Sequence, residues 1–205
     1  MTASPIPVGD HPRFVLLRGE TSQDDFAADV RAGLTASPKS LPPRWFYDDL
    51  GSSLFDAICF LPEYYVMRAE SEVLTSHTGE ITHELGSDIR LVELGSGAAR
   101  KTRILLDALT VRQQKLEYVP VDIDGSMLAR VGRDLLAAYP RIRVTGIESD
   151  FSRPSAALAG LPPAGKRTVV LFLGSTIGNL EPPAAMAMLR DLRASLSPGD
   201  ALFLG

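Results

Sequence analysis

The chain has 205 residues, of which 45% are hydrophobic and 22% are charged, and its formal net charge at pH 7 is −4. This length and composition indicate a globular protein with one domain, or one domain and an appended subdomain, and exclude the disordered and fibrous classes. The acidic balance argues against a nucleic-acid-binding surface, which needs a basic stripe. Small molecules are therefore the expected partners.

Cysteine and histidine usage gives no sign of a disulfide framework or a metal site. Cys59 is the single cysteine, and the three histidines are scattered. His77 and His83 are six residues apart, a spacing that does not place them on one helical face. The N-terminal stretch MTASPIPVGDHPRF has prolines where a signal peptide needs an apolar core, and no segment has the roughly 18 apolar residues of a membrane span. We expect a cytoplasmic monomer without metal, membrane or nucleic-acid partners.

In chain order, the N-terminal part predicts a mostly helical segment over residues 1–85. Residues 1–18 contain three prolines and few periodic apolar positions, so we expect an extended arm. A weakly amphipathic stretch at 22–34 predicts a helix, and the run ASPKSLPP at 36–43 predicts a linker. Apolar residues at helical spacing return in RAESEVLTSHTGEITHEL, residues 68–85.

From residue 86 onward the pattern changes to alternating strands and helices. The expected strands are RLVELG, LEYVPVDI, IRVTGIESDF, TVVLFLG and ALFLG, and the expected helices lie around 101–112, 125–138 and 184–196. This alternation predicts right-handed crossovers and a mostly parallel sheet covered on both faces. The predicted class is therefore a doubly wound α/β fold over 86–205, in which ligands bind beyond the carboxyl ends of the strands.

A glycine-rich corner, GSG in LVELGSGAARKTRILLDAL, lies between the first of these strands and the following helix. Gly95 and Gly97 permit positive φ and close approach of a ligand to the backbone, near the positive end of a helix that we expect from about Arg100. A dinucleotide fingerprint would need a third glycine at Arg100. A phosphate-binding loop would need glycine there too, followed by Lys101 and Thr102, and the strands TVVLFLG and ALFLG lack the aspartate that would hold its magnesium ion.

A third ligand, S-adenosyl-L-methionine, fits the corner better, because it needs backbone approach but no pyrophosphate cradle. It also needs an acid at the tip of the second strand for the ribose hydroxyls, and Asp122 lies 25 residues after Gly97. Asp150 ends the third strand, where it and Phe151 could bracket an adenine. Each aspartate alone is better explained as a turn-forming or capping residue. The joint occurrence of glycines and acids at three successive strand ends favours the cofactor.

Several long strings resemble a known family. They are PKSLPPRWFYDDLGSSLFDAICFLPEYYVMRAE, VELGSG followed by KTR, VPVDID and LFLGSTIGNLEP, and the resemblance that rests on them is dense from about Pro38 to Gly205. On these residues the chain resembles the histidine-specific, S-adenosylmethionine-dependent methyltransferases. The resemblance implies a methyltransferase-like Rossmann fold, S-adenosyl-L-methionine as the cofactor, and methylation of the α-amino group of L-histidine to trimethylhistidine, a step of ergothioneine biosynthesis.

The same resemblance implies roles for individual residues. It assigns Gly95 and Lys101 to the cofactor site together with Gly97 of the same corner, Asp122 to the ribose, and Asp150 with Phe151 to the adenine. Tyr64 would lie in the substrate pocket close to the imidazole, Tyr47 would line the entrance to the cofactor, and Gly174 and Asn179 would bind the amino and carboxylate end of histidine. No residue is assigned as a general acid, general base or nucleophile.

Physical chemistry is compatible with these roles. A sulfonium methyl group is a strong electrophile and a neutral amine is a competent nucleophile, so the enzyme mainly aligns the two and favours the uncharged amine. The amide of Asn179 offers a donor and an acceptor without adding charge. Alternative interpretations remain: Asn179 could cap the turn before Glu181, and Tyr64 and Tyr65 could be core aromatics with exposed hydroxyls.

Two departures from the family pattern matter. Ala98 and Ala99 stand where the family has small hydroxyl residues, which predicts a loss of roughly 1 kcal/mol of cofactor binding for each missing hydrogen bond. Members of the family also continue past the strand that ends at Gly205, and that continuation supplies further histidine-binding residues and the last strands. We therefore expect an incomplete α/β domain that retains partial cofactor affinity and lacks efficient histidine methylation. The alternatives are a non-catalytic cofactor-binding remnant or binding module, and a methyltransferase for another small amine.

Overall fold

A seven-stranded sheet forms the centre of the computed structural model, which describes residues 4–6, 11–18, 26–162 and 165–205. Its strands are β1 (Ser4–Ile6), β2 (Phe14–Arg18), β3 (Ile89–Leu94), β4 (Leu116–Asp122), β5 (Ile142–Glu148), β6 (Arg167–Phe172) and β7 (Ala201–Leu204). Their order across the sheet is β1-β2-β5-β4-β3-β6-β7. Within the described residues β1 pairs antiparallel with β2, and the other five neighbouring pairs are parallel. The predicted mostly parallel sheet is confirmed.

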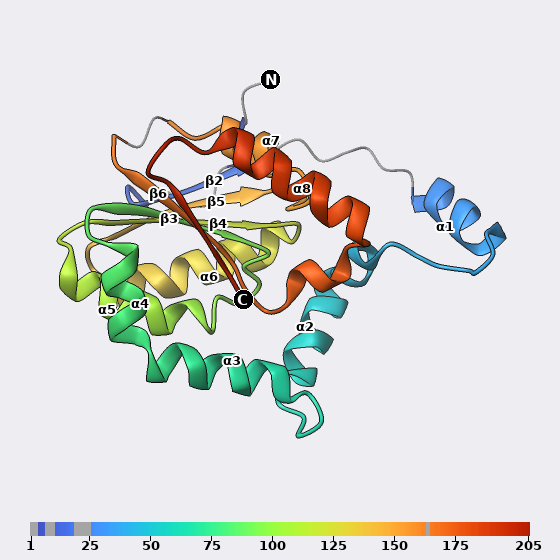
Figure 1. Cartoon of the computed structure of the whole chain (residues 1–205), viewed down its shortest axis with the longest axis horizontal. Coiled ribbons are helices and arrows are strands. Elements are labelled where there is room, and N and C mark those ends of the chain that lie inside the picture. Colours follow the sequence, from blue (N-terminus) through green and yellow to red (C-terminus); the bar gives the residue numbers. More distant parts are fainter. Residues whose placement is uncertain (1–3, 7–10, 19–25, 163–164) are drawn as a thin grey trace.

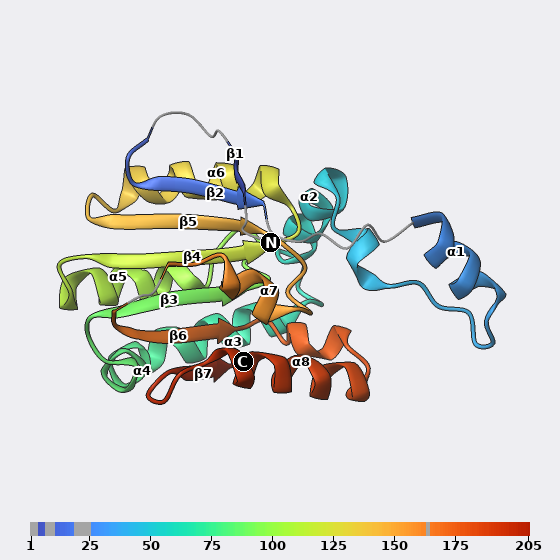
Figure 2. The same ribbon diagram turned by 90° about the horizontal axis from the view of Figure 1, so that it is seen from above.

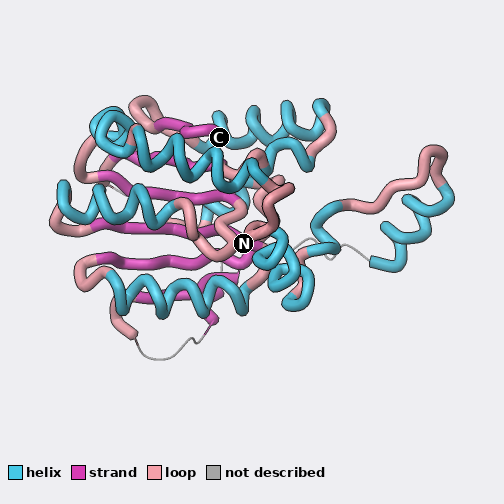
Figure 3. The backbone as a smooth tube through the Cα atoms, turned by 90° about the horizontal axis from the view of Figure 1, so that it is seen from below, coloured by secondary structure: helices cyan, strands magenta, loops and turns pink. Residues whose placement is uncertain are grey.

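Helices cover both faces of this sheet (Figure 1). The helices of the described residues are α1 (Phe26–Thr35), which stands apart from the sheet, α2 (Asp49–Ile58), α3 (Tyr65–Ser76), α4 (Thr78–Leu85), α5 (Thr102–Arg112), α6 (Gly125–Ala138), α7 (Pro154–Ala159) and α8 (Pro182–Ser195), with 3₁₀ turns η1 (Pro43–Phe46) and η2 (Thr176–Asn179). The helices α3 to α6 pack on one face and α7 and α8 on the other (Figure 2). Seen from below, the first of these layers lies in front of the strands (Figure 3).

The core consists of two apolar layers separated by the sheet. Because successive side chains of a strand point to opposite faces, Leu91 packs in the layer with α3 to α6, and Val92 packs in the layer with α7 and α8. Both side chains are fully buried. The continuous apolar runs of the sequence are therefore the signature of strands that are covered on both sides. No helix in the described ranges combines the length and the apolar character that crossing a membrane requires.

The N-terminal residues differ from the sequence-based prediction. The stretch 1–18, expected as an arm, contributes β1 and β2, and β2 pairs in parallel with β5. The predicted helical segment 1–85 thus also supplies sheet. The helix predicted at 22–34 is α1, which begins at Phe26, and residues 22–25 lie outside the described ranges. The helix α7 was not predicted, because six residues are too few to reveal a helical period.

Close packing holds β2 in the sheet. Phe14 is 4% exposed and its ring lies against Gly132 of α6, where an added Cβ would come within 2.5 Å of the ring. At the start of β2, Nη1 of Arg13 donates hydrogen bonds to the carbonyls of Tyr139 and Ile142, each at 3.0 Å. A glycine on α6 therefore makes room for the aromatic ring, which sequence periodicity does not reveal.

Substitution of Phe14 by alanine tests this packing. We expect Phe14→Ala to lower the free energy of unfolding by about 3 kcal/mol, because it removes a buried ring and leaves a cavity beside α6. Val15→Ala is the matched control, since Val15 in the same strand is 44% exposed; its loss should stay below about 1 kcal/mol. Urea denaturation followed by circular dichroism measures both, and equal losses would contradict the burial of β2.

Candidate functional site

The strand order creates a crevice at one edge of the sheet. From β3 the chain proceeds through β4 to β5 on one side, and β6 and β7 lie on the other side of β3. In open α/β sheets a reversal of this kind opens a crevice beyond the carboxyl ends of the strands. A cavity of about 450 Å³ lies there. The residues that follow β3, β4, β5 and β6 line it, and residues of α2 and α3 complete its wall.

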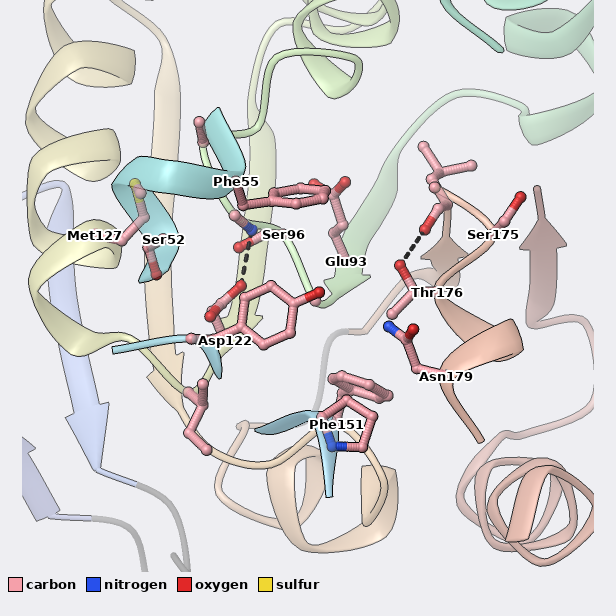
Figure 4. A pocket seen from close by; sticks show the side chains of 18 of the residues that line it. Ser52, Phe55, Glu93, Ser96, Asp122, Met127, Phe151, Ser175, Thr176 and Asn179 are labelled. Atoms are coloured by element: carbon pink, nitrogen blue, oxygen red, sulfur yellow. Dashed lines mark hydrogen bonds between the residues drawn. The ribbon is translucent and has the colours of Figure 1, made fainter. Parts of the chain in front are cut away.

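All ten site residues predicted from the sequence line this one cavity. They are Tyr47, Tyr64, Gly95, Gly97, Lys101, Asp122, Asp150, Phe151, Gly174 and Asn179. In Figure 4, Asp122, Phe151 and Asn179 surround the same hollow, with Phe55 across from them. The geometry therefore brings the predicted cofactor residues and the predicted substrate residues together. Their individual roles remain proposals.

Backbone hydrogen bonds fix the glycine corner against the neighbouring strand. The N–H groups of Gly95 and Ser96 both donate to the carbonyl of Val121, at 2.8 and 3.1 Å. The φ angles are +68° at Gly95 and +48° at Gly97, in the left-handed region that glycine adopts without strain. The helix α5 begins at Thr102, slightly later than the sequence predicts. The corner is thus a rigid turn whose backbone faces the cavity.

Ser96, the middle residue of the corner, is a candidate site residue that the sequence did not reveal. Its side chain is 7% exposed, and its Oγ has no hydrogen-bond partner within the described part of the chain. Ser96 also lines the cavity. A buried hydroxyl without a partner is costly, and a polar ligand group would satisfy it. This hydroxyl therefore fits a polar ligand at the corner.

Asp122 ends β4 and closes the corner. Its Oδ2 accepts a hydrogen bond from Gly97 N at 2.7 Å, and its Oδ1 accepts one from Asp124 N at 3.1 Å. Burial raises the pKa of the Asp122 carboxyl, and these backbone hydrogen bonds oppose the rise. The turn-forming interpretation of this aspartate is therefore correct. It does not exclude a ligand, because each carboxylate oxygen has a second lone pair that can accept from a diol.

Asp150 and Phe151 lie beyond the end of β5. The Oδ1 of Asp150 accepts a hydrogen bond from Ser152 N at 2.8 Å, and Oδ2 lies 4.0 Å from Nη1 of Arg44. The ring of Phe151 packs against Phe172 with 5.6 Å between the ring centroids. This pair thus offers an acid and an apolar face next to each other in the cavity wall.

A row of aromatic rings forms the wall contributed by the N-terminal helices. Phe55 of α2 lies between Tyr47 and Tyr64, with edge-to-face contacts and centroid distances of 5.9 Å on each side. Burial raises the pKa of both tyrosine hydroxyls. Of the two adjacent tyrosines in PEYY, Tyr64 lines the cavity, whereas Tyr65 is 66% exposed. The hydroxyl groups of Tyr47 and Tyr64 therefore form the polar part of this wall.

Asn179 ends η2 opposite this wall. Burial raises the pKa of the Tyr47 hydroxyl, and the nearby amide of Asn179 acts in the opposite direction. Glu181 is the N-cap residue of α8, so Asn179 does not hold that position. Its amide is directed at the cavity, where Figure 4 shows it near Phe151.

Two acids that sequence reasoning did not single out, Glu70 and Glu93, also line the cavity. Glu70 of α3 forms an ion pair with Lys101 and accepts a hydrogen bond from Gly174 N at 2.8 Å. Glu93 of β3 is 4% exposed. Only their position within strings that resemble the family could have indicated them, since an acid in a helix or strand has no distinctive spacing. The described residues contain no group of three or more His, Cys, Asp and Glu that could hold a metal ion.

Glu93 belongs to a buried hydrogen-bond network. Thr102 Oγ1 donates to Oε1 of Glu93 at 2.6 Å, and the Tyr118 hydroxyl donates to Oε2. Burial raises the pKa of the Glu93 carboxyl, and these two hydrogen bonds and the charge of Lys101 oppose the rise. The resulting pKa is about 7. This network joins β3, β4 and the start of α5 directly below the glycine corner.

The comparisons with known proteins agree with the sequence-based resemblance. The sequence model of the family described as histidine-specific methyltransferase, SAM-dependent, matches residues 26–205. A histidine N-alpha-methyltransferase of Mycolicibacterium smegmatis is 46% identical over 189 residues, 92% of this chain and 57% of the relative. One of Mycobacterium tuberculosis is 44% identical over 177 residues, 86% of this chain and 54% of the relative. The chain spans about half the length of these curated relatives.

A solved structure supports the fold independently. The crystal structure of a protein from Thermobifida fusca, described as a methyltransferase, superposes with a TM-score of 0.53 at 21% sequence identity. The superposition covers 77% of this chain and 59% of that protein. At this identity the likeness concerns the fold alone. It confirms the expected methyltransferase-like α/β architecture.

The raised pKa of Glu93 predicts a pH dependence of stability. The carboxyl has a pKa near 4.5 in the unfolded chain and about 7 in the folded protein. Between these values the folded protein holds a proton that the unfolded chain has released, so stability falls as pH rises. The contribution is fully present below about pH 4.5 and is lost as the pH passes through about 7.

Glu93→Gln removes this titration while keeping the shape of the side chain. From pH 5 to pH 8 the wild type should lose on the order of 3 kcal/mol more unfolding free energy than the variant. Urea denaturation of both proteins at a series of pH values measures the difference. Parallel stability profiles for the two proteins would show that Glu93 does not titrate in this range.

Proposed function

Because the chain belongs to the family of histidine-specific, S-adenosylmethionine-dependent methyltransferases, we propose that its cavity binds S-adenosyl-L-methionine and L-histidine side by side for methyl transfer to the α-amino group of histidine. The single observation that carries this proposal is the convergence of all ten predicted residues on one cavity of about 450 Å³. The finer part of the proposal, repeated transfer to trimethylhistidine as a step of ergothioneine biosynthesis, follows the family resemblance.

The cofactor half of the cavity fits S-adenosylmethionine. The turn at Gly95 and Gly97 lets an amino-acid or ribose group approach the backbone, and the unpartnered hydroxyl of Ser96 needs a polar ligand. Asp122 would accept hydrogen bonds from the ribose hydroxyls, and Phe151 would pack against the adenine. When bound, the cofactor supplies an electrophilic methyl group on a sulfonium centre.

Lys101 and Asp150 would complete the cofactor half. The ammonium of Lys101 would bind the carboxylate of the amino-acid end, since an ammonium has three donors and Glu70 uses one of them. The Oδ1 of Asp150 accepts from Ser152 N, and its Oδ2, which lies 4.0 Å from Nη1 of Arg44, would accept from a donor on the adenine. These assignments match S-adenosylmethionine better than a dinucleotide, whose fingerprint needs a third glycine where this chain has Arg100.

The substrate half would hold the amino acid between the aromatic wall and η2. Tyr64 would contact the imidazole, and Tyr47 would lie where the substrate half meets the cofactor half. Gly174 and the amide of Asn179 would bind the amino and carboxylate end. An uncharged amide and an apolar wall favour the neutral amine over the ammonium ion, and the neutral amine is the nucleophile that methyl transfer requires.

These residues would act by alignment and by exclusion of water. A methyl transfer between two bound groups needs the amine in line with the sulfonium carbon at near-attack distance, and orientation alone lowers the barrier substantially. The three rings of Tyr47, Phe55 and Tyr64 keep that side of the cavity apolar. The proton of the ammonium is lost to solvent before the reaction, so no side chain needs to act as a general base.

Product analysis by mass spectrometry tests the proposal. The purified chain is incubated with S-adenosylmethionine and one amine at a time. The three amines are histidine, tryptophan, and histidine blocked at the α-amino group. We expect methylated histidine above a control without protein, with no methylation of the blocked compound. Preferential methylation of tryptophan would show that the substrate is another amine and not histidine. The absence of any methylated product from a folded chain that also fails to bind S-adenosylhomocysteine would contradict the function itself.

The adjacent tyrosines allow a matched test of the substrate half. Tyr64→Phe removes one hydroxyl from the cavity, so we expect about tenfold weaker histidine binding, equivalent to one lost hydrogen bond. Tyr65→Phe removes a hydroxyl from a side chain that is 66% exposed and should leave binding unchanged. Calorimetric titration of histidine into the chain saturated with S-adenosylhomocysteine measures both. A loss in Tyr65→Phe as large as that in Tyr64→Phe would contradict the assignment.

A further inference from the structure

The carboxylate of Glu70 connects three elements that are far apart in the sequence. Glu70 belongs to α3, and its Oε2 accepts a hydrogen bond from Nζ of Lys101, the N-cap residue of α5. Its Oε1 accepts a hydrogen bond from Gly174 N, just after β6, at 2.8 Å. The side chains of Glu70 and Lys101 are 14% and 13% exposed. A single, largely but not fully buried carboxylate therefore lies between the cofactor side and the substrate side of the cavity.

A side chain at Gly174 would displace the ammonium of Lys101. Gly174 has a φ of +81°, and a Cβ at this position would lie 2.8 Å from Nζ of Lys101 and 3.3 Å from Oγ1 of Thr176. The ammonium thus packs directly against the glycine backbone, beside the carboxylate that binds both. Movement of the Lys101 side chain consequently changes the surroundings of the Gly174 peptide.

Electrostatics makes this arrangement interdependent. A buried carboxylate is stable only when it is paired and hydrogen-bonded, and removal of one partner leaves an uncompensated charge. Glu70 is paired with Lys101 and hydrogen-bonded to Gly174 N. The position of the ammonium and the orientation of the Gly174 peptide therefore depend on the same two oxygen atoms.

The start of α3 is held by other contacts. Nη1 and Nη2 of Arg68 donate to the carbonyls of Leu61 and Pro62 at 2.8 and 2.5 Å, which fixes the loop before the helix. Tyr64, the N-cap residue of α3, packs against Phe55. We therefore expect a change at Glu70 to act through Lys101 and Gly174, because these contacts at the start of α3 do not involve Glu70.

We propose that Glu70 is a positioning residue that couples the cofactor half of the cavity to the substrate half. This inference rests on the proposed function, in which Lys101 binds the cofactor and Gly174 binds the amino acid. A ligand that fixes the position of the Lys101 ammonium also fixes the carboxylate of Glu70. That carboxylate then keeps the Gly174 peptide in its binding orientation. Because coupling between two sites is reciprocal, each ligand tightens the binding of the other by the same factor.

Calorimetric titrations with S-adenosylhomocysteine, without and with saturating histidine, test this inference. The ratio of the two dissociation constants is the coupling factor, expected to be at least about fivefold in the wild-type chain. Glu70→Gln removes the charge at constant shape and should bring the factor close to one. Lys101→Met removes the same ion pair from the other side and should have the same effect. The double variant should lose no more coupling than either single variant.

The matched control is Glu72→Gln, on the same helix, because Glu72 is exposed to solvent. It should keep the wild-type coupling factor. A Glu70→Gln variant that binds S-adenosylhomocysteine with undiminished coupling would overturn the inference and leave the proposed function standing. A folded wild-type chain that fails to bind S-adenosylhomocysteine would overturn both, whereas one that binds it without regard to histidine would overturn this inference alone. If Glu70→Gln does not fold, Lys101→Met decides by the same criterion.

Discussion

Parallel pairing of β3 with β4 on one side and with β6 on the other is the constraint on which the site depends. Because all three strands run in the same direction, the loops after them leave the sheet at the same edge. The glycine corner, Asp122 and Gly174 lie at or just beyond the ends of these strands and consequently meet at one cavity. Burial on both faces holds this geometry, since apolar side chains on either face of β3 pack into the two core layers.

Acidic side chains determine the character of the cavity floor. Glu93 lies below the glycine corner in a buried network with Tyr118 and Thr102. Glu70 lies beside it and is paired with Lys101. The two acids join α3, α5, β3, β4 and the loop after β6 through side-chain hydrogen bonds. The parallel strands and these acidic side chains therefore stabilise the same arrangement of the residues that face the ligand.

Much of the fold could be predicted from the sequence, but the helix–sheet contacts and the acids below the site could not. Continuous apolar runs and their alternation with helices indicated the doubly wound sheet, because strands buried on both faces have that pattern. The strand β2 was missed because its five residues show no period and its place depends on the contact of Phe14 with Gly132. Glycines and acids at strand ends indicated the cofactor residues. Glu70 and Glu93 were missed because tertiary packing brings them to their partners. Lys101 is 31 residues from Glu70, and Tyr118 is 25 residues from Glu93.

A crystal structure of the chain with S-adenosylhomocysteine and histidine tests the central claim most directly. The claim predicts the adenosine between Asp122 and Phe151, and the amino group of histidine between Asn179 and the cofactor sulfur. It also predicts that the amino-acid end of the cofactor contacts Lys101. Ligands bound away from the edge formed by the ends of β3, β4 and β6 would contradict it.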